Sequence, residues 1–241
     1  MPVTWVWVQF GSLIEELRNG VSIRPNIDPP GTPILRINAA RPGRIDLDEV
    51  RFLKNGSDYL PEYELKDRDL LFTRYNGSLE LLGVCGMVRQ LGKTVRLYPD
   101  KLMRARFDHE FVLPEYAEIF FQSPDVHDRV IAKSKSSAGQ NGVSGSDIKA
   151  QPFALPPIAE QQEIVRRAEA LFKTADALEA RYRKAKAHVD KLTQSILAKA
   201  FRGELVPQDP NDEPASALLE RIKAQKAGQK IKAPRKRKAR A

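Results

Sequence analysis

Hydrophobic residues follow two different patterns along this 241-residue chain. Up to about residue 153 they form short β-type runs separated by turn residues, as at 32–37, 69–74 and 83–88. Residues 11–18 and 114–132 have helical spacing instead. Residues 134–146 are rich in Ser and Gly and predict a flexible polar loop, followed by a last strand at 153–155. The pattern therefore predicts a mixed α/β domain over residues 1–153.

A heptad pattern follows the Pro156-Pro157 pair, which favours an extended hinge. Apolar or tyrosine residues recur at alternating spacings of four and three over 33 residues that contain no Gly or Pro. This 3.5-residue period predicts one helix of roughly 50 Å that pairs with a second helix along a seam. We expect the seam to be a dimer interface, formed by Ile164, Ala168, Leu171, Ala175, Leu178, Tyr182, Ala185, Val189, Leu192 and Ile196.

Gly203 is expected to end this helix, because glycine readily adopts a left-handed conformation. A second helix is predicted over 214–225. The chain then divides into a globular domain at 1–153, a hinge and long helix at 154–203, a turn and helix at 204–225, and a basic tail at 226–241.

The positive charge of the chain comes from its last residues. Lys and Arg number 40 and Asp and Glu 31, but residues 1–153 hold 20 of each sign and residues 154–221 hold 11 of each. Residues 222–241 hold nine Lys or Arg and no acid, so we expect a disordered tail. It either attracts nucleic-acid phosphates without sequence preference or is a solvated end without function.

Composition excludes several classes of protein. No apolar run approaches the roughly 18 residues that span a bilayer, and the first residues lack a secretion signal pattern. The lone Cys85 excludes an intramolecular disulfide framework and a Cys-rich zinc site. We therefore expect a cytoplasmic protein that does not contact membranes.

Catalytic motifs are weak. Asp46 or Asp48 with Glu64 and Lys66 is similar to the acidic pair plus lysine with which nucleases hold Mg²⁺. A surface charge cluster is the favoured explanation of these residues. A Mg²⁺-dependent nuclease stays open as an alternative. The main expectation is a chain that is not an enzyme and holds no metal or cofactor of its own.

Several segments together resemble specificity subunits of type I restriction-modification systems. They are LPPIAEQQEIV at 155–165, AFRGELVPQDPNDEPA at 200–215, DLLFTRYNGSLELLG at 69–83, SSAGQNGVS at 136–144 and WVWVQFG at 5–11. The resemblance implies an α+β fold, with a globular target recognition domain, a long antiparallel coiled-coil helix and a short C-terminal helix. It also implies a DNA-binding subunit whose partners are double-stranded DNA and type I methyltransferase and restriction subunits. S-adenosylmethionine, ATP and Mg²⁺ would belong to those partner subunits.

The family usually carries two recognition domains and two long helices, whereas this chain carries one of each. We therefore expect a half-length form that pairs with a second copy of itself. Antiparallel pairing about a two-fold axis would place two recognition domains in inverted orientation, so that the homodimer recognises an interrupted palindrome. An orphan half-subunit that exchanges with or inhibits a full system is the other interpretation.

Candidate DNA contacts follow from the chemistry of base recognition, in which Arg binds guanine and Asn or Gln binds adenine through paired hydrogen bonds. Two segments offer these groups on loops: Arg74, Tyr75 and Asn76, and Gln140 and Asn141. Phosphate contacts are expected from Lys133, Lys135, Ser136 and Ser137. A secondary basic group consists of Arg89, Lys93, Arg104 and Arg106.

Overall fold

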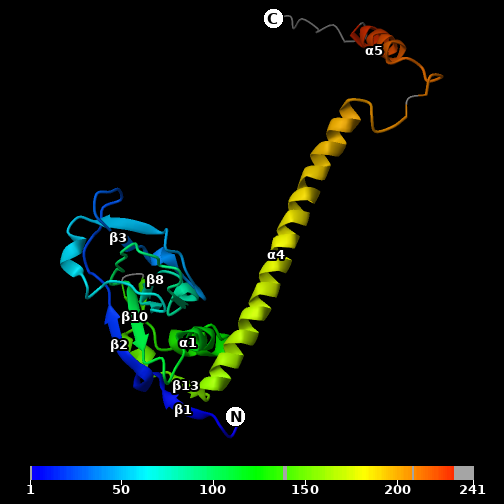
Figure 1. Ribbon diagram of the computed structural model, residues 1–241. Coiled ribbons are helices and arrows are strands. Elements are labelled where there is room, and N and C mark those ends of the chain that lie inside the picture. The colour runs from blue at the N-terminus through cyan, green and yellow to red at the C-terminus, as the bar shows by residue number, and fades with distance from the viewer. Residues whose placement is uncertain (1, 138–139, 208, 231–241) are drawn as a thin grey trace, which may run out of the picture. The chain divides into compact units, whose positions relative to one another are not determined.

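The computed structural model describes residues 2–137, 140–207 and 209–230 (Figure 1). Two compact units make up the chain, Met1–Ala175 and Asp176–Ala241. The first unit has the mixed α/β fold expected from the sequence, and the second contains most of the long helix and a shorter one.

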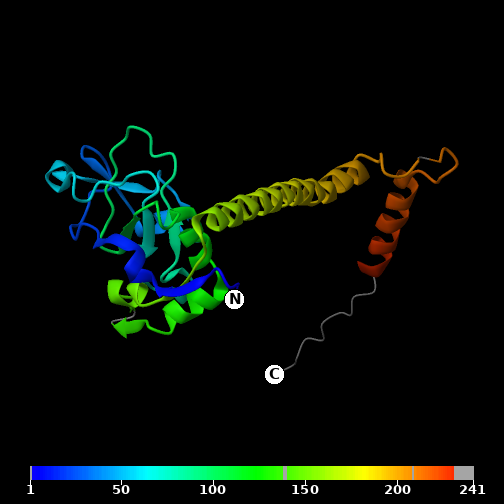
Figure 2. The same cartoon turned by 60° about the horizontal axis from the view of Figure 1, so that its bottom comes forward.

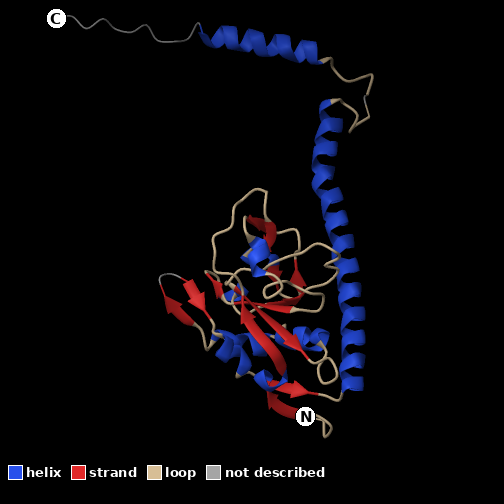
Figure 3. Ribbon diagram, turned by 60° about the vertical axis from the view of Figure 1, so that its left-hand side comes forward, coloured by secondary structure: helices blue, strands red, loops and turns tan. Residues whose placement is uncertain are grey.

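The first unit is built on a four-stranded antiparallel sheet with strand order β2-β10-β7-β9. These strands are Ile14–Asn19, Leu102–Phe107, Leu70–Thr73 and Cys85–Met87 respectively. Helices α1 (Pro114–Phe121) and α2 (Pro124–Ile131) lie beside this sheet (Figure 3). Smaller sheets complete the described part of this unit. Three of them have two strands: β1 (Val6–Gln9) with β13 (Pro152–Leu155), β3 (Thr32–Leu35) with β6 (Val50–Leu53), and β4 (Ala40–Arg41) with β5 (Arg44–Ile45). The fourth has three strands, β8 (Tyr75–Asn76), β12 (Gln140–Gly142) and β11 (Lys135–Ser137).

Short helices fill the connections of this unit. They are the 3-10 turns η1 (Phe10–Leu13), η2 (Ile37–Ala39), η3 (Gly56–Tyr59) and η4 (Leu79–Leu81), and the α-helix α3 (Gly145–Lys149). The β3–β6 pair and the loops around it lie at the opposite end of the unit from β1 and β13, as both views of the ribbon show (Figures 1 and 2).

Hydrophobic side chains cover both faces of the central sheet. Leu70 and Phe72 of β7 face a cluster around Phe10, whereas Leu71 faces a second cluster that contains Tyr98. Successive side chains of a strand point to opposite faces, so a strand between two cores is apolar throughout. This is why the run at 69–74 could be predicted as a strand from its composition.

The predicted helix at 11–18 is wrong, because most of it forms strand β2. A bulge explains the misleading pattern. Ile14 pairs with Phe107 and Glu16 with Arg106, so Glu15 is an extra residue opposite β10. The bulge places Ile14 and Leu17 on the same side, against the cluster around Phe10, with the spacing of three residues that is typical of a helix.

The helical prediction for 114–132 is confirmed, but as two helices. Pro124 begins α2, and the residue before a proline is disfavoured in helical conformation. The flexible loop predicted at 134–146 is wrong for the described residues, which form β11, β12 and the start of α3; Ala138 and Gly139 lie outside the described residues. The strand predicted at 153–155 is confirmed as β13.

The long helix α4 runs from Ile158 to Phe201 without interruption, 44 residues in all. Its first turns pack on the first unit. Gln161 is buried, where its side chain accepts a hydrogen bond from the Leu113 amide (2.9 Å) and donates to the carbonyl of Phe111 (3.1 Å). Ile164, predicted for the seam, also packs partly on the core of this unit.

From Leu171 onward the large apolar seam side chains are exposed in the single chain: Leu171 (70%), Leu178 (67%), Tyr182 (65%), Val189, Leu192 and Ile196. Gly203 has a positive φ of 72°, as expected at the end of this helix. The second helix, α5 (Ala215–Lys230), continues through 226–230, where disorder was predicted. Residues 231–241 of the basic tail lie outside the described residues.

Candidate DNA-recognition surface

The structure brings the two predicted recognition segments together in one small sheet. Strand β12 lies between β8 and β11, so Asn141 pairs with both Asn76 and Ser136. Gly142 in turn pairs with Tyr75 and Lys135. Ser137 pairs with Gln140 in the same hairpin. Residues from two distant segments of the sequence therefore form one small polar sheet.

The register divides these residues between two faces. Side chains directly across neighbouring strands share a face, so Ser136, Asn141 and Asn76 form one row. Tyr75 and Lys135 lie on the other face. The Asn76 Oδ1 atom accepts a hydrogen bond from the Ser78 amide (3.0 Å). That bond leaves mainly the amide N–H groups of Asn76 for a ligand.

The face with Tyr75 lines a hollow of about 540 Å³, which we call the recognition hollow. Arg74 stacks on the Tyr75 ring, with the guanidinium carbon 4.7 Å from the ring centroid. Neither Arg74 nor Gln140 has a side-chain hydrogen bond or ion pair with any residue that the structure describes. The hollow is lined by Arg74, Tyr75, Lys135, Gln140, Gly142, Val143, Ser144, Ser146 and Asp147.

Glycine at position 142 allows the Tyr75 ring to lie against the strand. A Cβ atom on Gly142 would come within 2.6 Å of Tyr75 Cε1. The absence of a side chain here therefore sets the position of the ring, and through it the position of the stacked guanidinium.

Asp147 adds a carboxylate to the recognition hollow. It caps α3 together with Ser144: the Ser144 amide donates to Asp147 Oδ2 (2.8 Å), and the Asp147 amide donates to Ser144 Oγ (3.1 Å). Burial alone would raise the pKa of Asp147, but the hydrogen bonds from Ser144 and the charges of Lys135 and Lys133 outweigh it and lower this pKa. An ionised carboxylate can accept a hydrogen bond from the amino group of cytosine.

Sequence reasoning missed Asp147, although its signal was present. Ser144 and Asp147 have the spacing of a capping box, with an acidic residue three positions after the capping serine. A helix start was therefore detectable inside the segment that was predicted to be a loop.

Two residues of the secondary basic group are structural, which corrects their assignment as DNA contacts. Arg104 is 1% exposed, pairs with Glu16, stacks over Tyr98 and donates to the carbonyls of Glu62 (3.2 Å) and Glu64 (3.0 Å). Arg106 pairs with Asp69 at 2.6 Å. Ion pairs with acidic residues of the first unit thus hold both side chains.

The other two members lie apart from the recognition hollow's lining. Arg89 forms a two-point ion pair with the carboxylate of Glu118, which is buried, and this contact raises the pKa of Arg89 against the opposing effect of burial. Lys93 is exposed in a turn. Lys133 is exposed after α2 and lines a neighbouring hollow that also includes Asp147.

The family model for the type I restriction modification DNA specificity domain matches residues 2–187 of the chain. The chain belongs to this specificity-domain family. The match covers the whole globular unit and the first part of α4, so it includes every strand of the recognition hollow.

Curated relatives of this specificity domain are themselves type I subunits. The chain is 50% identical to the EcoKI specificity subunit of Escherichia coli K12 over 91% of this chain and 49% of the relative. It is 34% identical to the StySPI specificity subunit of Salmonella potsdam over 93% of this chain and 50% of the relative. The chain thus spans about half the length of these curated relatives.

Solved structures show the same fold at lower identity. The specificity domain superposes with a TM-score of 0.59 on the HsdS subunit from Thermoanaerobacter tengcongensis, at 19% identity, covering 89% of this chain and 52% of that one. A chain from a structure that addresses complex assembly and conformational transition of the type I R-M system gives a TM-score of 0.63, also at 19% identity, over 85% and 47% of the two chains.

The acidic residues proposed for a nuclease do not form a metal site in this specificity domain. Asp46 Oδ1 accepts a hydrogen bond from the Asp48 amide (3.0 Å), as in an ordinary turn. Within the described ranges no group of three or more His, Cys, Asp or Glu side chains could hold a metal ion. This arrangement does not favour the nuclease alternative. None of the helices that the structure describes is both long and apolar enough to span a bilayer.

Proposed function

We propose that this chain is the DNA-recognition component of a type I restriction-modification system and contacts base edges from the recognition hollow. One observation carries the proposal: in a chain of the specificity-domain family, Arg74 and Gln140 line the same hollow, and their side chains form no hydrogen bond or ion pair with the residues that the structure describes. These are the groups that bind guanine and adenine through paired hydrogen bonds. Lys135 beside them supplies a positive charge for phosphate.

The chain would act without catalytic residues of its own. Methyltransferase and restriction subunits would dock on it and supply S-adenosylmethionine, ATP and Mg²⁺, and its part would be to hold them at the recognised sequence. The family membership and the similarity to curated specificity subunits support these partners.

A second copy of the chain would supply the second DNA-recognition domain. The exposed seam of α4 supports this, because six large apolar side chains at heptad spacing need a partner helix to be buried. An antiparallel pair of α4 helices would carry two recognition hollows in inverted orientation, matched to an interrupted palindrome. Exchange of α4 with that of another specificity subunit is the alternative, and the symmetry of the recognised sequence distinguishes the two.

The test first co-expresses the chain with a type I methyltransferase subunit and identifies the DNA sequence that becomes methylated. Arg74 is then replaced with Ala, and binding of the variant to a duplex that carries this sequence is measured. Removing a guanine contact should weaken specific binding by about 1–3 kcal/mol and leave the oligomeric state unchanged. Lys173→Ala is the matched control, since it removes an exposed cation of α4 that does not line the recognition hollow and was not predicted to contact DNA. Wild-type affinity of the Arg74→Ala variant would remove Arg74 from the interface.

A further inference from the structure

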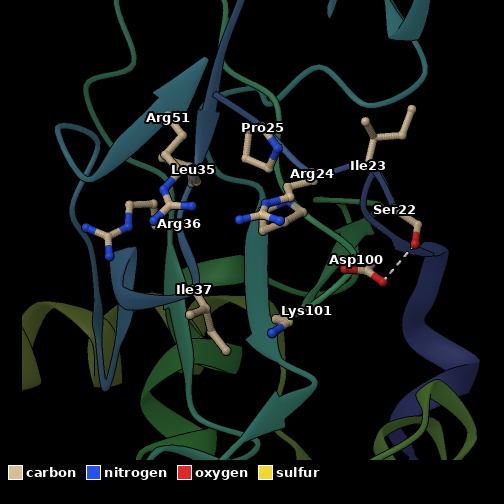
Figure 4. A pocket seen from close by; sticks show the side chains of 11 residues that line it. Ser22, Ile23, Arg24, Pro25, Leu35, Arg36, Ile37, Arg51, Asp100 and Lys101 are labelled. Atoms are coloured by element: carbon tan, nitrogen blue, oxygen red, sulfur yellow. Dashed lines mark hydrogen bonds between the residues drawn. The ribbon is translucent and has the colours of Figure 1, made fainter. Parts of the chain in front are cut away.

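A second hollow, of about 480 Å³, lies on the first unit and collects positive charge (Figure 4). Arg24 follows β2, Arg36 follows β3, Arg51 lies in β6 and Lys101 precedes β10. Four segments that are separate in sequence thus place cations around one opening, which we call the basic hollow. No motif in the sequence marks it.

Most of these cations have no partner among the described residues. Arg36 pairs with Glu49 at 3.1 Å. Arg24, Arg51 and Lys101 make no ion pair and no side-chain hydrogen bond with the residues that the structure describes. The acid of the basic hollow, Asp100, accepts a hydrogen bond from Ser22 Oγ (3.1 Å). Three unpaired cations against this one carboxylate leave the hollow with excess positive charge, which favours an anionic ligand.

The basic hollow and the recognition hollow are lined by residues that are backbone neighbours. The backbone amide of Arg74 donates to the carbonyl of Lys101 at 2.8 Å. Lys101 lines one hollow and Arg74 lines the other, so a single hydrogen bond joins their backbones. A polyanion that contacts Arg74 therefore has a second group of cations beside it. Ile23, which is exposed, adds an apolar side chain to the lining of the basic hollow, suited to contact with a sugar.

We propose that the basic hollow binds phosphates of the same DNA duplex whose bases are contacted from the recognition hollow, through Arg24, Arg51 and Lys101. This inference rests on the proposed DNA-recognition function. Phosphate contacts fix the orientation and register of a protein on a duplex but carry no base identity. The basic hollow therefore contributes affinity, and the recognition hollow contributes sequence preference.

The experiment uses the full chain with Arg24→Ala, Arg51→Ala and Lys101→Ala combined, and measures fluorescence anisotropy on two labelled duplexes between 50 and 200 mM salt. One duplex carries the methylated sequence, and the other is a scrambled duplex of equal length and composition. Affinity should fall by the same factor, about tenfold or more, for both. The slope of log K against log salt should become shallower by about 0.9 for each phosphate that the variant no longer binds, and the preference between the duplexes should stay unchanged.

The matched control removes three charges from the second unit, by Arg181→Ala, Lys184→Ala and Lys191→Ala. These α4 residues are exposed and likewise form no ion pair with described residues, so they report the effect of net charge alone. Arg51 is partly buried, and a second variant, Arg24→Gln with Lys101→Gln, therefore changes only exposed side chains. A shallower slope for both hollow variants than for the control supports the proposal.

A slope equal to that of the control in both hollow variants overturns the proposal, and so does a loss of sequence preference without a change of slope. Failure of the proposed function itself has a different signature. In that case the wild-type chain would bind the methylated and scrambled duplexes equally, whatever the hollow variants do.

Discussion

At the scale of single residues, the partner of an arginine decides what it does. Arg74 and Arg104 were both predicted to contact DNA, and each follows or lies within a strand of the first unit. Arg104 meets Glu16, 88 positions away in sequence, and is buried against Tyr98. The side chain of Arg74 stacks on the ring of its neighbour Tyr75 and forms no ion pair with a described residue. Sequence showed the charge of both residues but could not show which carboxylates the fold brings near.

Arg104 should therefore matter for stability. Replacing it with Ala leaves Glu16 and two backbone carbonyls without their shared donor, which we expect to cost about 2–4 kcal/mol in the free energy of unfolding; the lower end reflects the partial exposure of Glu16. Urea unfolding of the purified chain measures this change. The control Lys93→Ala should stay within about 0.5 kcal/mol of wild type. Equal stability of the two variants would contradict the structural assignment of Arg104.

At the scale of elements, the sequence predicted the helices and strands whose hydrophobic pattern repeats within the element itself. The apolar run of β7 and the long heptad of α4 each contain enough residues to define their period. Strands β11 and β12 do not, because their Ser, Gly and Gln residues favour loops. They form strands because β12 pairs with β8, more than sixty residues earlier, and β11 pairs with β12. The bulge of β2 shows the opposite case, in which a long-range pairing imitates a helical period.

The packing of β12 on Tyr75 can be tested by Gly142→Val. The added side chain would collide with the Tyr75 ring and displace Arg74, so specific DNA binding should fall about tenfold or more, with dimerisation intact. Gly77→Ala, directly after the neighbouring strand β8, is the control, since a Cβ atom there meets nothing within 4 Å. Equal binding by both variants would show that the position of the Tyr75 ring does not matter for recognition.

The seam of α4 is tested by Leu178→Asp. A carboxylate at the centre of an apolar helix pair is costly to bury, so the dissociation constant of the dimer should rise by about a hundredfold or more. Sedimentation velocity measures the monomer fraction. Ala180→Asp adds the same charge to an exposed position of α4 outside the apolar seam and should leave the dimer intact. If both variants dissociate, the cause is a general effect of the added charge. If neither dissociates, the seam is not the dimer interface.

At the scale of the whole molecule, the family and the heptad were both recognisable from sequence, because motifs such as LPPIAEQQEIV are long and the seam is regular. The contacts within the recognition surface were not. They depend on the register of β8, β12 and β11, which is set by pairing over long sequence distances. Identity and architecture were thus predictable, whereas the hollows and their unpaired cations required the fold.

Pairing of two chains predicts the symmetry of the recognised DNA. When the chain is co-expressed with a type I methyltransferase subunit and no other specificity subunit, N6-methyladenine should map to an interrupted palindrome. Its two halves would be inverted, because a two-fold protein places identical contacts on both half-sites. The length of the helix pair would separate them by something on the order of one helical turn of DNA. Leu178→Asp should abolish methylation at every site, while Ala180→Asp should retain it. Two unlike half-sites would instead show that α4 pairs with the helix of a different specificity subunit, and a homodimer would then not be the reader.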